Sequence, residues 1–332
     1  MGQDDSNFSS NIEDLDNLCA LWEEDRQSLE WTPLFVVPPW LRAWWDVFGS
    51  PRSSYLYTVR NQKGELVGLA PLVVRGNRAF FMGSEDVCDY MDFLVAAGSE
   101  ERFFDLFWQD IKSEGIRSLT LGAVRHDSRV ATHLVKSARE RGLDVSRKKI
   151  DVSLEIDLPG SWEAYLGLLT GKQRHELRRK LRRVQESAEA RFRVIEDIEE
   201  HRNALELFFQ LFRKSRKDKD EFMRPDRESF FRALAANMSR AGLLRIDLLE
   251  LAGKPVATFL AFDYEEVVYL YNSGFDPQYG NLGVGLVSKI LCIKDSIEKG
   301  KRKFDFLKGP ELYKYRLGGK EVPLESCRIN LG

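Results

Sequence analysis

The chain is poor in cysteine and histidine, with four of each among 332 residues. The cysteines lie far apart and form no C-x-x-C pair: Cys19, Cys88, Cys292 and Cys327. The histidines fall in no ligand pattern: His126, His133, His175 and His201. This distribution argues against a structural zinc site and a disulfide framework, so we expect no metal and a reducing compartment, the cytoplasm.

Long hydrophobic runs are also missing. No apolar stretch reaches the roughly 18 residues that would span a membrane, so we expect no transmembrane segment. The first ten residues, MGQDDSNFSS, lack the basic and apolar regions of a signal peptide. Glycine (24) and proline (11) are near average usage, which excludes collagen, and 43% hydrophobic residues exclude a disordered chain.

Charge is balanced overall but uneven along the chain. The formal net charge is −2, yet residues 1–160 hold 18 basic and 26 acidic residues, whereas residues 161–332 hold 32 and 26. The second half is therefore the natural partner for an anionic ligand, unless the asymmetry is only an uneven solvated surface. A neutral protein with one basic helix gives no support for DNA binding.

Hydrophobic periodicity and turn residues predict two similar halves. The first half predicts helices over residues 12–27, 39–48, 100–114 and 129–141, and strands over 54–59, 65–74, 78–82, 116–121 and, as one or two strands, 145–156. The second predicts helices over 163–169, 173–189, 199–217, 226–241 and 283–299, and strands over 192–195, 243–251, 255–262, 266–273 and 303–307. Both halves share the order helix, helix, three-strand meander, helix and strand. We expect an α/β (α+β) fold with domains 1–159 and 160–332, divided near Pro159-Gly160.

A glycine-rich turn, FDPQYGNLGVG at residues 275–285, follows a predicted strand and opens a helix. Gly283 and Gly285 allow the backbone to approach a ligand closely. The helix start adds unpaired N–H groups and a partial positive charge, which together suit a pyrophosphate. The Walker pattern is absent, and the preceding strand belongs to a meander, unlike a Rossmann fingerprint.

This turn resembles the acyl-CoA pyrophosphate loop of the GNAT acetyltransferase superfamily, V-x-P-x-Y-[RQ]-x-x-G-x-[GA]. Gly280 stands where the family has Arg or Gln, which removes a side chain but keeps the amide. The resemblance implies that acetyl-CoA or another acyl-CoA is held by Phe275, Tyr279, Gly280, Asn281, Leu282, Gly283, Val284 and Gly285.

Two further segments make the resemblance more specific. Residues 305–314, DFLKGPELYK, and residues 83–92, GSEDVCDYMD, resemble elements of the CelD-like (cellulose-biosynthesis acetyltransferase) subgroup, which is similar to the Fem-type peptidoglycan aminoacyltransferases. The resemblance implies two GNAT-like domains, each a mixed, mostly antiparallel sheet flanked by helices. Because residues 83–92 lack a G-x-G turn, we expect one cofactor site per chain, with the first half shaping the acceptor pocket.

Direct acyl transfer needs a base for the acceptor and a proton source for the thiolate, but no covalent nucleophile. Consistently, G-x-S-x-G and a Cys/His pair are missing. Asp89 is our candidate base and Asp92 the next, because Asp86, Asp89 and Asp92 are close enough to raise one another's pKa. A solvated acidic loop or a helix cap is the alternative. The resemblance places Tyr313 near the cofactor sulfur, with Glu311 as a further candidate.

Acceptor contacts are expected from both halves. The candidates are Tyr90, Tyr271, Asn272, Lys314 and two arginines of the basic helix, Arg174 and Arg178. Tyr90 could equally be core. The basic helix could be a solvated face, or could bind a nucleotide-sugar diphosphate, a lipid phosphate, the 3′-phosphate of CoA or a tRNA backbone.

We therefore predict an acyl-CoA-dependent N- or O-acyltransferase acting on a small-molecule or sugar-containing precursor of the cell envelope or an exopolysaccharide. One alternative is a Fem-like aminoacyltransferase that takes its acyl group from tRNA, although the long helical hairpin of some Fem enzymes is not evident. The other is a non-catalytic GNAT-fold binding protein, suggested by Gly280.

Overall fold

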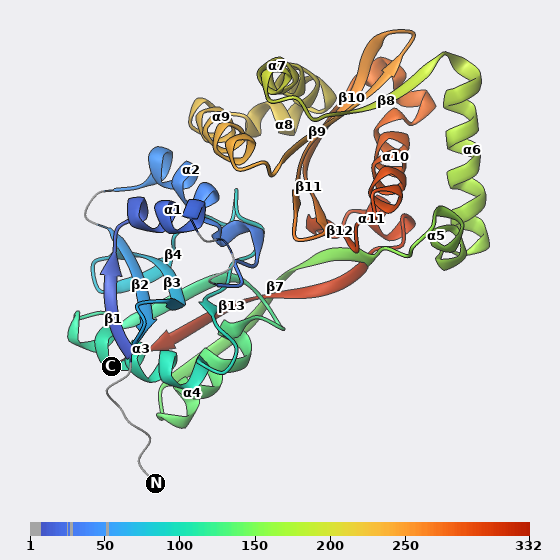
Figure 1. Ribbon diagram of the computed structural model, residues 1–332. Helices are drawn as coiled ribbons and strands as arrows, with labels where there is room; N and C mark the ends of the chain where they lie inside the picture. Colours follow the sequence, from blue (N-terminus) through green and yellow to red (C-terminus); the bar gives the residue numbers. More distant parts are fainter. Residues whose placement is uncertain (1–7, 25, 27–28, 51–52) are drawn as a thin grey trace. The chain divides into compact units, whose positions relative to one another are not determined.

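The computed structural model describes residues 8–24, 26, 29–50 and 53–332 (Figure 1). The chain divides into two compact units: unit 1, Met1–Val152 with Val322–Gly332, and unit 2, Ser153–Glu321. The sequence-based division at residues 159 and 160 places the last eleven residues in the second half, whereas in the structure they return to unit 1. None of the helices in the described part of the chain combines the length and hydropathy that crossing a membrane requires.

Unit 1 is built on a mixed sheet in which β1, β2, β3 and β4 are antiparallel neighbours. Strand β4 is parallel to β6, and β6 is antiparallel to β13. The bounds are β1 (Phe8–Glu13), β2 (Ser54–Asn61), β3 (Leu66–Arg75), β4 (Arg78–Phe81), β5 (Leu94–Val95), β6 (Ser118–Arg125), β7 (Asp144–Asp157) and β13 (Lys320–Asn330).

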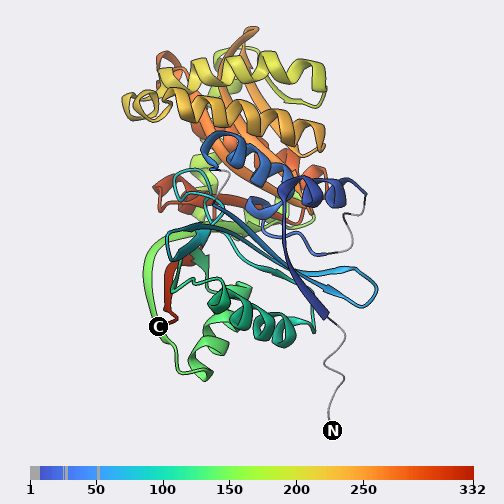
Figure 2. The same ribbon diagram turned by 90° about the vertical axis from the view of Figure 1, so that its left-hand side faces the viewer.

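Helices cover both faces of this sheet. Figure 2 shows α1 and α2, in blue, on one side of the strands and α3, in teal, on the other. The bounds are α1 (Leu15–Glu24), the 3-10 turn η1 (Leu34–Val36), α2 (Pro38–Phe48), α3 (Glu100–Ser113), the π-helical η2 (Val130–Leu134) and α4 (Val135–Glu140).

The predicted helix over residues 12–27 is wrong at its start. Residues from Phe8 to Glu13 extend and pair with β2, and the helix begins only at Leu15. The predicted end, Gln27, lies outside the described residues. Cross-strand pairing with a segment more than forty residues away overrides the local helical pattern, a tertiary effect that periodicity does not contain.

Unit 2 contains four antiparallel strands in the order β8, β9, β10 and β11, followed by β12 parallel to β11. The end of β7 pairs antiparallel with β12. The bounds are β8 (Ala190–Ile195), β9 (Leu244–Leu251), β10 (Lys254–Tyr264), β11 (Val267–Phe275) and β12 (Lys303–Lys308). Together the two units confirm the predicted fold class, a mixed and mostly antiparallel sheet flanked by helices.

The helices of unit 2 form layers on the two faces of its sheet. Figure 1 shows α7, α8 and α9 on one face, and α10 with α6 beside it on the other. The bounds are α5 (Trp162–Leu168), α6 (Gly171–Ser187), α7 (Ile198–Ser215), α8 (Lys217–Phe222), α9 (Pro225–Arg240), the 3-10 turn η3 (Pro277–Leu282), α10 (Val284–Glu298) and α11 (Leu312–Arg316).

Candidate active site

The glycine loop, residues 275–285, joins β11 to α10 in unit 2. Asp276 caps the turn η3: its Oδ1 accepts the N–H of Gln278 at 3.1 Å, and its Oδ2 lies 2.7 Å from Nζ of Lys214. Gly283 then takes the left-handed conformation, φ 71°, immediately before the first residue of α10. Glycine adopts this conformation without the steric cost that a side chain would add, so the turn is specified by its own residues.

The start of α10 has an electrostatic character that suits an anion. The N–H groups of Leu286 and Val287 donate to the carbonyl of Gly283 at 2.9 and 3.0 Å, so the N–H groups before them are the ones that can face a ligand, at the positive end of the helix dipole. A Cβ atom placed on Gly283 would lie 3.1 Å from Nζ of Lys180, a residue of α6. The ammonium group of Lys180 therefore lies beside the helix start.

The side chains of the glycine loop have a packing role. Phe275, Tyr279 and Leu282 pack against a core cluster that contains Val184 of α6, and Val284 is fully buried in that cluster. Gly280 and Asn281 are exposed, and a Cβ atom on Gly280 would have nothing within 4 Å. An arginine or glutamine, as in the GNAT pattern, would therefore fit at position 280.

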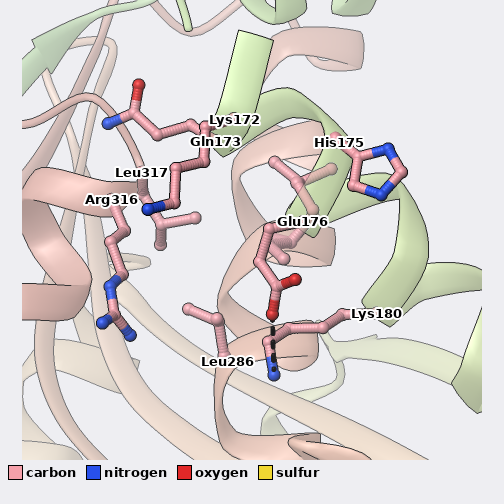
Figure 3. A pocket seen from close by; sticks show the side chains of 10 residues that line it. Lys172, Gln173, His175, Glu176, Lys180, Leu286, Arg316 and Leu317 are labelled. Atoms are coloured by element: carbon pink, nitrogen blue, oxygen red, sulfur yellow. Dashed lines mark ion pairs between the residues drawn. The ribbon is translucent and has the colours of Figure 1, made fainter. Parts of the chain in front are cut away.

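A pocket of about 660 Å³ lies between α6, α10 and α11. Figure 3 shows Lys172 and Arg316 on one side, and the ion pair of Glu176 with Lys180, 3.5 Å between Oε1 and Nζ, on the other. The lining residues are Lys172, Gln173, His175, Glu176, Leu177, Lys180, Leu286, Ile290, Arg316 and Leu317. Basic groups around an apolar floor suit a ligand with both charged and flat apolar parts.

The start of α6 fixes the position of this pocket wall. Thr170 and Gln173 form a capping box, in which each side chain accepts the other's backbone N–H, at 3.3 and 2.8 Å. Nε2 of Gln173 also donates to the carbonyl of Tyr315 at 2.9 Å, which ties α6 to α11.

The structure distinguishes two basic rows on α6. Lys172 and Lys180 line the pocket, whereas Arg174 and Arg178 do not. Arg178 is exposed, with Glu163 3.7 Å away. Both rows repeat at the spacing of helical turns, so the sequence offered no signal to prefer the lysine row.

The motif DFLKGPELYK forms the end of β12, the turn after it and the start of α11. Leu307 has a positive φ of 63°, and Oδ1 of Asp305 accepts its N–H at 2.7 Å. Nζ of the buried Lys314 donates to the carbonyls of Leu307, Lys308 and Gly309 at 2.7–3.0 Å. It also lies 2.8 Å from Oε2 of the exposed Glu311. Lys314, which we expected at the substrate, thus holds this turn together.

The sequence reasoning missed two lysines that meet at Ser273 of β11. Nζ of Lys289, on α10, donates to Oγ of Ser273 at 3.1 Å and to the carbonyl of Gly285 at 3.0 Å. Nζ of Lys219, on α8, donates to the carbonyl of Ser273. Burial lowers the pKa of Lys289 to about 7 and that of Lys219 to about 8. For Lys289, the sequence signal was a lysine on the apolar side of a predicted helix.

The remaining candidates of unit 2 lie around this region. The half-buried ring of Tyr313 is 4.9 Å from Nζ of Lys289. Tyr271 stacks on Phe231 with ring centroids 5.4 Å apart, and Asn272 pairs with β10. Tyr271 therefore serves the packing of β11 against α9.

In unit 1, Asp92 is a helix cap. Its carboxylate accepts the backbone N–H groups of Phe93, Arg129 and Val130 at 2.9, 2.6 and 2.9 Å. Burial raises its pKa to about 7, against the lowering effect of these bonds. The helix-cap alternative considered from the sequence thus describes its observed contacts.

The other unit 1 candidates differ in exposure. Tyr90 is buried against Phe35, with ring centroids 5.0 Å apart, and beneath the guanidinium of Arg125. Asp89 is half-buried in the turn after β4. Because Asp89 belongs to unit 1 and Tyr313 to unit 2, a proton path that joins them stays a prediction.

Comparison with known proteins supports the assignment of unit 2. Residues 171–315 match the family model described as acetyltransferase (GNAT) domain. No curated protein sequence matches the chain.

Solved structures share the fold at low identity. A crystal structure of FemX has a TM-score of 0.66 at 12% identity and covers 96% of both chains. L-PGS from Bacillus licheniformis has a TM-score of 0.59 at 14% identity, and the match covers 96% of this chain and 92% of that one. The C-terminal domain of a putative lysylphosphatidylglycerol synthetase from Agrobacterium fabrum has a TM-score of 0.55 at 13% identity, and the match covers 84% of each chain. Residues 171–315 of unit 2 are thus similar to a GNAT acetyltransferase domain, and this similarity supports an acyltransferase.

Proposed function

We propose that the protein transfers an acyl group, acetyl or another, from an acyl-CoA bound by unit 2. The observation that carries this proposal is the start of α10, where the ammonium group of Lys180 lies beside Gly283, 3.1 Å from the place a Cβ atom would take. Helix N–H groups and a neighbouring cation are the donors that a pyrophosphate requires.

The residues around this point fit CoA. Lys180 and the helix start would hold the pyrophosphate. The pocket beside them offers Leu286 and Ile290 as an apolar floor, with Lys172 and Arg316 as further cations. A thioester donor supplies the activated acyl group, and the protein has to supply base, proton and position.

For the acceptor, we propose a small-molecule or sugar-containing precursor of the cell envelope or an exopolysaccharide, handled in the cytoplasm. Asp89, in the acidic turn of unit 1, would remove the proton from the attacking amine or hydroxyl. Tyr313 would return a proton to the leaving thiolate. One structural neighbour is named a putative lysylphosphatidylglycerol synthetase, which supports an envelope component as acceptor.

A second candidate is an aminoacyltransferase that takes its acyl group from tRNA. The exposed arginines of α6 favour this candidate: Arg178, Arg182 and Arg183 are exposed and do not line the pocket. Such a row could follow an RNA backbone. The two candidates therefore use opposite flanks of one helix.

Paired variants of α6 separate these candidates. Calorimetric titration of the full chain with CoA should give one site per chain. The Lys172→Gln/Lys180→Gln variant should lose affinity about tenfold or more, since bonds to charged groups contribute ~1.5–3 kcal/mol. The Arg174→Gln/Arg178→Gln variant removes the same charge from the same helix and is the matched control.

Binding of bulk tRNA is measured on the same three proteins. Absence of CoA binding by the wild type, together with tRNA binding that only the arginine variant weakens, would establish the second candidate instead. Equal loss of CoA affinity in both variants would remove the pocket assignment.

A further inference from the structure

Two ammonium groups converge on one residue near the end of β11. Ser273 accepts a hydrogen bond from Lys289 through its hydroxyl, at 3.1 Å, and one from Lys219 through its carbonyl. The lysines come from two helices far apart in the sequence, α10 and α8. Their meeting point is therefore set by the tertiary fold.

This cluster carries excess positive charge. Among the residues that the structure describes, neither Lys219 nor Lys289 forms an ion pair, and Glu311 is 2.8 Å from a third ammonium, Lys314. Lys289 is only 6% exposed. Burying a cation without a carboxylate partner costs several kcal/mol, which is only partly offset by the rings of Phe259 and Tyr313, each 4.9 Å from Nζ.

The mutual effect of the charges is consistent with this imbalance. Burial lowers the pKa of Lys289 first, and the charge of Lys219 lowers it further. Strongly perturbed pKa values cluster at functional sites, and the negative charge of a ligand would balance this cluster. An anion between these groups would remove the repulsion and restore both charges.

The cluster also adjoins the start of α10, which we assign to the acyl donor. Strand β11 pairs with β12 only from Val267 to Tyr269, so Ser273 lies on the part of β11 that has left its parallel neighbour. Lys289 donates to the carbonyl of Gly285 at 3.0 Å, in the first turn of α10. The lysine thus connects Ser273 with the helix start that we assign to the donor's phosphates.

We propose that Lys219, Lys289 and the hydroxyl of Ser273 form a binding site for a substrate carboxylate, carried either by the acyl group of the donor or by the acceptor. This inference rests on the proposed function, because it assigns the specificity of the same site. Two ammonium groups and a hydroxyl give a carboxylate charge-assisted hydrogen bonds on both oxygens. No bond is made or broken at the cluster.

The donor arm of the test compares succinyl-CoA with butyryl-CoA, which differ by a terminal carboxylate in place of a methyl group. Wild type should bind succinyl-CoA about tenfold more tightly, a difference of ~1.4 kcal/mol. Lys289→Met should abolish or reverse the preference while retaining free CoA. Lys294→Met, at a lysine of the same helix whose side chain is 41% exposed, is the matched control and should keep the preference.

The acceptor arm uses succinate alone, added at saturating CoA. The Cε resonances of ¹³C-labelled lysine report the pKa of Lys289, which should rise by about one unit when the carboxylate binds. If wild type shows no preference between the two acyl-CoAs but succinate raises this pKa, the carboxylate belongs to the acceptor. The half-buried Lys219→Met is the second variant should Lys289→Met not fold.

The outcomes are separable from those of the proposed function. Binding of free CoA without any preference for succinyl-CoA, and without a response of Lys289 to succinate, would overturn the carboxylate site alone. Failure of every CoA derivative to bind would overturn the proposed donor, while the succinate titration, repeated without CoA, still decides the carboxylate site.

Discussion

Both units contain a strand, a helix and a second strand parallel to the first, yet the two helices begin in opposite electrostatic surroundings. In unit 1 this element is β4, α3 and β6; in unit 2 it is β11, α10 and β12. Helix α3 begins with Glu100 and Glu101, and Oε2 of Glu100 accepts the N–H of Gly98 at 2.7 Å. Helix α10 begins after Gly283, with Lys180 beside it.

The difference shows how one topology supports two roles. A carboxylate of the chain itself already faces the positive end of α3, so that helix start has no need of an external anion. The first turn of α10 contains no acidic residue, and the ammonium group of Lys180 lies beside Gly283. We infer that unit 2 holds the phosphorylated donor and that the acidic unit 1 serves the acceptor.

The largest expected effect tests the chemical role of unit 1. Asp89→Asn should lower kcat by roughly 10²–10⁴, because a general base contributes about that factor. Acyl-CoA affinity should be unchanged, and the pH–rate profile should lose its acid limb. Steady-state kinetics across pH and calorimetry measure both.

A folded Asp89→Asn enzyme with wild-type kcat and an unchanged acid limb would remove Asp89 from the mechanism. Glu311 would then be the next carboxylate to replace, since Asp92 caps a helix. Tyr313→Phe should show a smaller loss of kcat than Asp89→Asn, because water can protonate a thiolate.

The second prediction places a carboxylate at the start of α10, like those at the start of α3. Gly283→Glu should weaken acyl-CoA binding about a hundredfold or more, since it places a carboxylate at the helix start, where it would pair with Lys180. The left-handed backbone adds about 1–2 kcal/mol of strain. Calorimetry on the folded variant measures the affinity.

Gly253→Glu is the matched control for that strain. Gly253 has φ 75°, and a Cβ atom placed on it would have nothing within 4 Å. This variant should lose comparable stability and keep its affinity for CoA. Unchanged affinity in Gly283→Glu would mean that the phosphates bind elsewhere.

The third prediction contrasts the buried ionisable groups of the two units. Asp92 has a raised pKa, so its folded form holds more protons than the unfolded form between pH 3.8 and about 7, and stability should fall as pH rises through this window. Lys289 has a lowered pKa, so stability should rise between about pH 7 and 10.5. Each limb should change the free energy of unfolding by an amount on the order of 1–4 kcal/mol.

Urea denaturation at a series of pH values measures both limbs. Asp92→Asn should flatten only the acid limb and Lys289→Met only the alkaline one. The groups acting on Lys289 are Lys219 and Lys314, which lower its pKa, and Cys292 and Glu311, which raise it. A slope that survives the corresponding substitution would assign it to another group.

The smallest expected effect restores the family residue in the glycine loop. Gly280→Arg should tighten CoA binding about two- to fivefold, because a Cβ atom there meets no neighbour and an exposed ion pair with a phosphate contributes ~0.2–1 kcal/mol. Gln278→Arg, at a neighbouring exposed position, is the control. Weaker binding by Gly280→Arg alone would show that this position faces away from the phosphates.

The amino-acid sequence was sufficient for the features that depend on neighbouring residues. The order of most helices and strands in both units follows from local periodicity, and α2 and α10 begin within a residue of the expected positions. The glycine loop was recognisable because Gly283 and Gly285 stand in a turn between a predicted strand and a predicted helix, a pattern of neighbouring residues.

The meeting of distant groups, in contrast, depended on the folded arrangement. Asp92 caps a helix 37 residues away, and Lys180 reaches Gly283 from another helix. Strand β13, which the sequence reasoning missed, returns to unit 1 to pair with β6. These pairings depend on the packing of whole elements against one another, whose energies are not encoded in the spacing of residues within either partner.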